Sequence, residues 1–320
     1  MQKGDGTIKD YILKRLAMGV LLVISVSILV FSLLYMMPGN PIDIMVDRKV
    51  PAEKRAEMAH ELGYDRPMHE QYLSWAKDIV IEQDFGNSVR YKVPVWGLMM
   101  DRVPRSLMLC GWALFIEMLI ALPIGLICAI KKNSLFDRFT VNFTLMLTAM
   151  PSFWLGALLI IIFAVKLKWF PISGYQGMEY FVLPIFALVA STLAGTLRLT
   201  RSEVLEVLNE KYVTTAYAKG LPDRTVKVKH VLRNALIMVS VQVFMSVPWL
   251  ISGAVVTETI FGIPGMGNLL LNSIVVQDFP VVQAVLLLIA ILTVLFNLLS
   301  DIVIATLDPR IRIELSGGDK

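Results

Sequence analysis

Two histidine and glutamate pairs are the residues whose types could bind a metal ion. His60 stands beside Glu61, and His69 stands beside Glu70. Metal ligands on a helix must share a face. Pro67 interrupts any helix between the two pairs, and a separation of nine positions would in any case put the histidines on opposite faces. We therefore expect solvated surface histidines and no metal site.

Motifs that carry common catalytic chemistry are missing from the sequence. It contains no GxxxxGK[ST] phosphate loop, no HExxH, no CxxC and no Gly-x-Ser-x-Gly elbow. We therefore expect no catalytic residue and no cofactor bound by this chain. A membrane-anchored enzyme would need a constellation of reactive side chains that the sequence does not offer.

Ionisable residues are scarce within the apolar segments. Glu117 lies in the second apolar segment (106–130) and Asp301 lies in the sixth (281–306), with Asn297 one turn before Asp301. A transporter that is driven by an ion gradient binds its coupling ion at depth and usually carries more intramembrane charge. We expect Glu117 to form hydrogen bonds in the bundle interior and the energy for any transport to come from elsewhere. A self-powered secondary transporter or channel is the alternative.

The segment 198–234 is the longest polar interval between two apolar segments, and it contains eight Lys and Arg residues. Glu210 to Lys219 predicts a short helix, and Gly220 supplies a left-handed stop. Small side chains from Thr214 to Ala218 allow a partner to approach the backbone closely. The residues alone fit two interpretations of this segment equally well: a helix that docks on a partner protein, and an amphipathic connector that lies on anionic lipid.

The composition indicates that membrane-spanning helices hold the residues described above. The chain has 320 residues, of which 56% are hydrophobic and 18% are charged, and this is far more apolar than a soluble domain needs. We expect an all-α membrane protein with six transmembrane helices at 13–37, 106–130, 139–165, 181–197, 235–256 and 281–306. The second to fifth spans contain an internal proline, at Pro123, Pro151, Pro184 and Pro248. We expect kinks there that face other helices or a wet cavity.

Orientation follows from the basic residues of the short loops. They gather before the first span, between the second and third, between the fourth and fifth, and after the sixth, whereas the opposite side has only Lys166 and Lys168 in its short loops. Both termini are therefore predicted to be cytoplasmic. The predicted parts are 1–37 (N-terminus and first helix), 38–105 (extracytoplasmic cap), 106–306 (transmembrane core of five helices, with the cytoplasmic loop 198–234) and 307–320 (cytoplasmic tail).

The extracytoplasmic cap is predicted to be small and helical. Pro51 precedes AEKRAEMAHEL and Gly63 follows it, as at the two ends of a short helix. After Pro67 an apolar stripe at helical spacing is formed by Met68, Tyr72, Trp75 and Ile79, and Asp84 to Asn87 predicts a turn. We expect this cap to pack on the helix bundle.

At the loop 198–234 the sequence resembles the inner-membrane permeases of binding-protein-dependent ABC importers, whose cytoplasmic EAA loop docks on an ATPase subunit. TTAYAKG, from Thr214 to Gly220, takes that place, although Thr214-Thr215-Ala216 departs from Glu-Ala-Ala and Met238 stands where proline often follows RNALI. The resemblance implies that an ATPase is contacted by Tyr212, Val213, Thr214, Thr215, Ala216, Tyr217, Ala218, Lys219, Gly220 and Leu221.

Further motifs are similar to those of the B-type permease of dipeptide and oligopeptide importers, a subunit type that nickel and glutathione importers share. They are PGNP at 38–41, GYDRPMHEQYLSW in the cap, LFDRF at 135–139, MPSFWLG at 150–156, FPISGY at 170–175, VVTETIFGIPGMGNLL at 255–270, VQDFPVVQAV at 276–285 and LDPRIR at 307–312. The resemblance covers nearly the entire chain.

The resemblance implies a machine located in the bacterial or archaeal cytoplasmic membrane. This chain would pair with a C-type permease, two cytoplasmic ATPases would bind ATP and magnesium, and an extracytoplasmic binding protein would deliver peptides. Import of nickel or another small solute by the same machine is the alternative. ATP binding would move the coupling loop and open the spans outward, and hydrolysis would restore the inward-facing state.

Polar and aromatic residues near the proline kinks are candidates for the translocation pathway, with helix packing as the alternative for each. They are Ser152, Trp154, Ser191, Thr192, Ser246, Trp249 and Ser252. Glu258, at the external end of the fifth span, is a candidate for contact with the binding protein or with a peptide amino group.

Overall fold

The computed structural model describes residues 4–36, 50–61, 63 and 65–307. The described residues form helices and contain no β-strand, and one isolated β-bridge pairs Asn87 with Pro94. Five helical segments are long and apolar enough to cross a membrane, and a bent pair of helices makes a sixth if it is counted as one span. The predicted all-α membrane fold is therefore confirmed.

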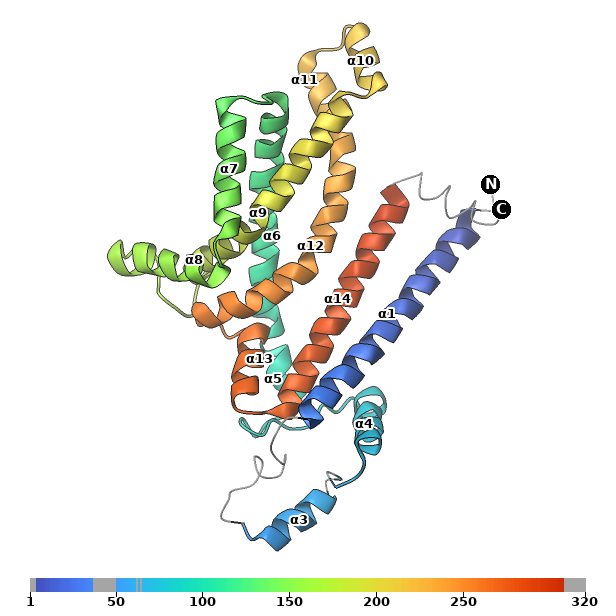
Figure 1. Cartoon of the computed structure of the whole chain (residues 1–320), viewed down its shortest axis with the longest axis vertical. Coiled ribbons are helices and arrows are strands. Elements are labelled where there is room, and N and C mark those ends of the chain that lie inside the picture. Colours follow the sequence, from blue (N-terminus) through green and yellow to red (C-terminus); the bar gives the residue numbers. More distant parts are fainter. Residues whose placement is uncertain (1–3, 37–49, 62, 64, 308–320) are drawn as a thin grey trace.

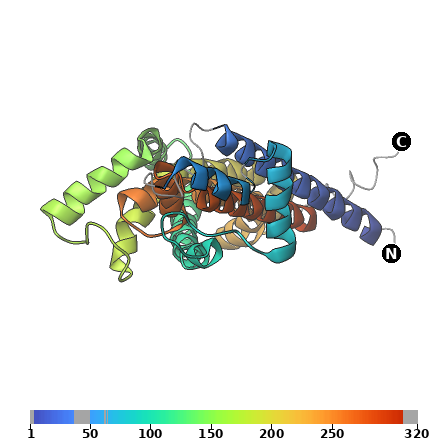
Figure 2. The same ribbon diagram turned by 90° about the horizontal axis from the view of Figure 1, so that it is seen from below.

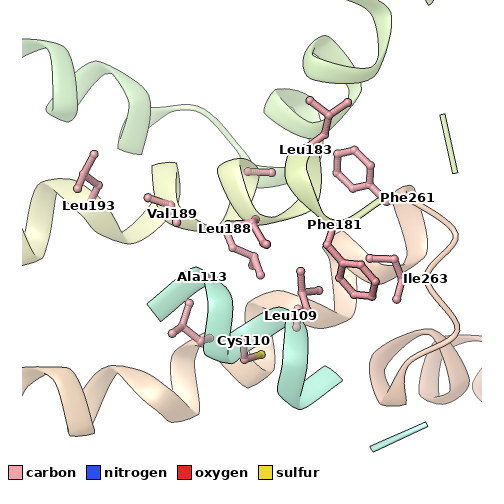
Figure 3. Close-up of a cluster of buried hydrophobic side chains, with 14 of the residues drawn as sticks. Leu109, Cys110, Ala113, Phe181, Leu183, Leu188, Val189, Leu193, Phe261 and Ile263 are labelled. Carbon is pink, nitrogen blue, oxygen red and sulfur yellow. The ribbon is translucent and has the colours of Figure 1, made fainter. Parts of the chain in front are cut away.

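Three long helices form the centre of the bundle (Figures 1 and 3). They are α6 (Val103–Ile130), α9 (Glu179–Leu208) and α12 (Arg233–Ile260). Leu109 of α6, Leu188 of α9 and Leu250 of α12 are almost fully buried in one apolar cluster between these helices. Glu117 is buried there and accepts a hydrogen bond from Thr196 Oγ1 at 2.6 Å. Glu117 is thus a buried, hydrogen-bonded residue of the bundle interior, as predicted.

The third span differs from its prediction as a single helix over 139–165. The segment is broken into α7 (Leu135–Ala149) and α8 (Ser152–Leu159), which continues as η2 (Ile160–Lys166), and the helix axis bends by 100° between α7 and α8. Met150 has an extended backbone, with φ −81° and ψ 131°. The residue before a proline is driven from the helical region, so Pro151 produces a break here and not a mild kink.

The fourth and fifth spans extend beyond their predicted ends. The helix α9 runs to Leu208, and α11 (Asp223–Thr225) and η3 (Val226–Leu232) lead without interruption into α12. Most of the polar loop 198–234 is therefore helical. A short apolar helix that was not predicted, α13 (Met266–Val275), precedes α14 (Phe279–Leu307).

The cap contains the two helices that the sequence predicts. They are α3 (Ala52–Glu61) and α4 (Met68–Lys77), and α4 continues as η1 (Asp78–Glu82). The ring of Tyr72 lies 5.5 Å from that of Phe31 in α1 (Gly4–Tyr35), and Tyr72 Oη lies 2.8 Å from Ser27 Oγ. The apolar stripe of α4 thus packs on the first span. In Figure 2, which views this end of the molecule, α3 and α4 lie in front of the long helices, and Figure 1 shows that α3 stands clear of them.

Two ends of the bundle can be distinguished in Figure 1. The α10 end carries α10 (Lys211–Ala218), α11 and the turn between α6 and α7, and the first residues of α1 and the last of α14 point toward it. The α13 end carries α3, α4, α5 (Val95–Met100) and α13. The basic loops that were predicted to be cytoplasmic therefore share one end, and the assignment of that end to the cytoplasm stays a prediction. The PGNP motif and residues 308–312 lie outside the described residues.

Candidate functional site

The helix α10 is attached to the bundle by its inner face. Val213 and Ala216 are buried, and they belong to an apolar cluster with Val204 of α9, Val226 of η3 and Ala129 of α6. The spacing of three residues between Val213 and Ala216 puts both side chains on one face of the helix. α10 is thus packed on η3 and shares one apolar cluster with the ends of α6 and α9.

The end of α10 has the hydrogen bonds of a Schellman motif. Leu221 N donates to Ala216 O at 3.3 Å, and Gly220 N donates to Tyr217 O at 2.9 Å. Gly220 has a φ of +76°, and a Cβ placed there would meet no atom within 4 Å. Glycine is therefore required by the backbone conformation and not by lack of space, as the sequence predicted for this position.

The outer face of α10 is exposed and its two tyrosines are held in place. Tyr217 Oη donates to Asp223 Oδ1 at 2.9 Å, and Asn234 Nδ2 donates to Tyr212 Oη at 3.0 Å. Burial and the bond to Asp223 raise the pKa of the Tyr217 phenol, which therefore keeps its proton at neutral pH. The exposed residues of the predicted contact are Tyr212, Thr214, Thr215, Tyr217, Ala218, Lys219 and Gly220. The structure thus offers a rigid, exposed helix face.

Glu258 does not lie on the surface, where a contact with the binding protein or a peptide was predicted. Its side chain is fully buried, and its carboxylate accepts hydrogen bonds from Ser106 Oγ at 2.5 Å, Gly267 N at 2.8 Å and Asn268 N at 3.1 Å. The unpredicted helix α13 folds back over the end of α12 and covers this residue. In this structure Glu258 caps the first turn of α13 and is not available to a partner.

Two structural features of the α13 end were not predicted from the sequence: the cap on α13 and the glycines that leave room for it. A Cβ on Gly267 would collide with the backbone of Val255, and one on Gly265 would collide with the Glu258 carboxylate. Ser106 links a third element, because its Oγ accepts from Met266 N at 2.8 Å. The spacing of glycines in GIPGMG was the available signal, since glycine often marks a close approach of two backbones.

The pathway candidates are distributed over α8, α9 and α12. Ser191 Oγ donates to Leu188 O at 2.6 Å, and Ser246 Oγ donates to Val243 O at 2.8 Å, so both hydroxyls are bonded to their own helices. Thr192 makes a similar bond to Val189 O at 3.4 Å.

Two of the remaining candidates lie at the bend between α7 and α8. Ser152 begins α8 directly after the bend, and Trp154 is 45% exposed. The side chains of Trp249 and Ser252 lie outside the described residues. A pathway lined by these residues stays a prediction.

Comparison with known proteins identifies the family. The family described as "Binding-protein-dependent transport system inner membrane component" matches residues 121–313, and a family that describes the N-terminal part of such membrane components matches residues 8–110. The chain belongs to the inner membrane components of binding-protein-dependent transport systems. It is therefore a transport permease of the inner membrane and not a member of an enzyme family.

Curated relatives match this permease along nearly its entire length. The oligopeptide transport system permease protein AppB of Bacillus subtilis is 36% identical, over 94% of this chain and 98% of the relative. The dipeptide transport system permease protein DppB of Escherichia coli K12 is 34% identical, over 95% and 98%. The glutathione transport system permease protein GsiC of Salmonella paratyphi A is also 34% identical, over 95% and 99%.

A solved structure has a similar fold. The crystal structure of an amino acid ABC transporter with histidines aligns with a TM-score of 0.51 at 14% identity, and the alignment covers 66% of this permease and 94% of that chain. At this identity the match concerns the fold alone. It agrees with the helical membrane architecture described above.

Proposed function

We propose that this permease forms half of the translocation pathway of an ATP-driven peptide importer and receives mechanical work through α10. The observation that carries the proposal is the construction of α10, whose inner face is buried while its outer face is exposed with fixed tyrosines. A helix that transmits force needs a rigid attachment to the spans and a free face for its partner. A connector lying on lipid would instead present an apolar face to the membrane, whereas the apolar face of α10 is covered by the chain itself.

The proposed complex contains four further subunits. They are a second, C-type permease, two cytoplasmic ATPases that bind ATP and magnesium, and an extracytoplasmic binding protein. In this complex, closure of the ATPases displaces α10 and the attached ends of α6 and α9, and the spans open outward. This order of events places the α10 end in the cytoplasm, in agreement with the clustering of basic loops there.

Peptides are the proposed substrate class. Support comes from the printed functions of the relatives, which transport oligopeptides, dipeptides and glutathione. The pathway candidates on α8, α9 and α12 are mainly hydroxyl and aromatic side chains, and such a lining would suit substrates of varied sequence.

The test is to reconstitute the complex with its binding protein in liposomes and to measure ligand-stimulated ATP hydrolysis and uptake. Di- and oligopeptides should stimulate both, and nickel should not. Gly220→Asp, which strains the end of α10, should abolish co-purification of the ATPases while the permease remains in the membrane. Normal co-purification and uptake in this variant would show that α10 is not the contact, and stimulation by nickel alone would reject the peptide assignment.

A further inference from the structure

An ion pair between α7 and α9 has a geometry that resists displacement. Arg201 Nε donates to Asp137 Oδ1 at 2.7 Å, and Arg201 Nη2 donates to Asp137 Oδ2 at 2.8 Å. The two parallel hydrogen bonds fix the guanidinium and carboxylate planes relative to one another. The Asp137 side chain is 3% exposed and that of Arg201 is 23% exposed, so solvent weakens this pair less than a surface pair.

The Asp137 carboxylate also closes the turn between α6 and α7. Asn133 N donates to Asp137 Oδ2 at 2.8 Å, and Ser134, the N-cap of α7, accepts from Asp137 N through its Oγ at 3.2 Å. Asn133 has a φ of +64°, so the turn has one defined backbone conformation. A single carboxylate therefore connects this turn to α9.

The pair lies directly beside the attachment of α10. Val204, one turn after Arg201 on α9, is fully buried in the cluster that holds Val213 of α10. Ala129, at the end of α6 just before the turn, belongs to the same cluster. One apolar cluster thus links α10, which packs on η3, to the ends of α6 and α9, and the ion pair adds α7 to this group.

The helix α7 leads from this pair to the 100° break at Pro151. Beyond the break lies α8, which carries two of the pathway candidates, Ser152 and Trp154. A shift of α9 that is passed to the start of α7 would be carried along its 15 residues to the break. Besides the pair, α7 is linked to this group by the α6–α7 turn and by its packing along α9.

We propose that Asp137 and Arg201 are positioning residues that transmit the displacement of α10 and α9 to α7 and α8. The proposal rests on the proposed function, because it requires α10 to be the element that the ATPases move. The role proposed for Asp137 and Arg201 differs from a role in assembly alone. An ion pair needed only for folding would affect the amount of complex, whereas an ion pair that transmits motion affects how much substrate is moved for each ATP hydrolysed.

The experiment uses the complete reconstituted importer with Asp137→Asn, Arg201→Ala and Arg201→Lys. Its readouts are the ATPase content of the purified complex, basal ATP hydrolysis, stimulation by the loaded binding protein, and uptake per ATP. We expect normal ATPase content and basal hydrolysis in all three variants. Uptake per ATP should fall by about tenfold in Asp137→Asn and Arg201→Ala, within the range of typical coupling factors. Arg201→Lys should lie between these and the wild type, since it keeps the charge and loses the two-point contact.

A matched control is available on the same helix. Arg198→Ala removes an exposed arginine, one turn before Arg201, whose Nε donates to Ala194 O of its own helix. It should leave uptake per ATP unchanged. Unchanged uptake per ATP in Asp137→Asn and Arg201→Ala would overturn the proposal, and so would a loss confined to the amount of complex. If Asp137→Asn does not accumulate in the membrane, Arg201→Lys decides by the same readouts. A wild-type chain that binds no ATPase would instead reject the proposed function itself.

Discussion

Ser88 and Asp278 lie 190 positions apart in the sequence, and the Ser88 hydroxyl donates to the Asp278 carboxylate at 2.5 Å. The same carboxylate accepts from the backbone N–H groups of Val89 and Arg90 at 3.1 and 3.2 Å. The segment before α5 is thereby attached to the residue that precedes α14. One buried acidic side chain fixes part of the predicted cap to the permease core.

Asp278→Ala should destabilise this attachment. The substitution leaves two backbone donors and one hydroxyl without their acceptor, and each buried unsatisfied group costs about 1–3 kcal/mol. We expect a lower unfolding temperature of the purified protein in detergent and faster proteolysis between residues 84 and 94. Ser88→Ala, which removes one donor and leaves the backbone contacts, should have a smaller effect. Equal stability of the wild type and Asp278→Ala would contradict this assignment.

Glu258→Ala should reduce the stability of the permease without changing the affinity of the binding protein for the complex. The carboxylate is buried and holds the first turn of α13, so its removal leaves the N–H groups of Gly267 and Asn268 unpaired. The cost is on the order of 2–5 kcal/mol. Thermal unfolding and a binding titration on the reconstituted complex measure the two effects separately. A loss of binding-protein affinity at unchanged stability would restore the direct contact that the sequence predicted.

Tyr217→Phe should weaken the ATPase contact by a small factor. The variant keeps the ring and loses the hydrogen bond to Asp223, so the exposed side chain becomes free to rotate. The acceptor is a carboxylate exposed to solvent, and such a hydrogen bond contributes about 0.5–1.5 kcal/mol, which corresponds to roughly a two- to tenfold lower affinity for the ATPase. Titration of the purified ATPase onto the permease in nanodiscs gives this number. Ser202→Ala, on the exposed part of α9, serves as the control, and equal affinity in Tyr217→Phe would show that the fixed ring is not needed.

The sequence predicted those elements whose cause is local. Gly220 and the small residues before it were sufficient to predict α10, and Pro67 with its apolar stripe was sufficient to predict α4. The Asp137–Arg201 pair had only a local signal, the Ser134-x-x-Asp137 cap, because its partner is 64 positions away. Burial of Glu258 was not predicted, although the glycines of GIPGMG signal a close approach of two backbones. It depends on α13, a ten-residue helix that is too short to be recognised as a span.

The break at Pro151 can be tested by a distance measurement between spin labels at Phe139 and Ile161, which are 69% and 47% exposed. A straight helix at about 1.5 Å per residue would separate these positions by roughly 33 Å, whereas a 100° bend between two arms of half that length brings them to about 20 Å. We expect the shorter distance in the wild type. In Pro151→Ala, Met150 regains access to the helical region and position 151 regains an N–H donor, so a population near the longer distance should appear. Leu145→Ala, with the same labels and the proline in place, should keep the shorter distance. A single population near 33 Å in the wild type would mean that α7 and α8 form the continuous span that the apolar pattern over 139–165 predicted.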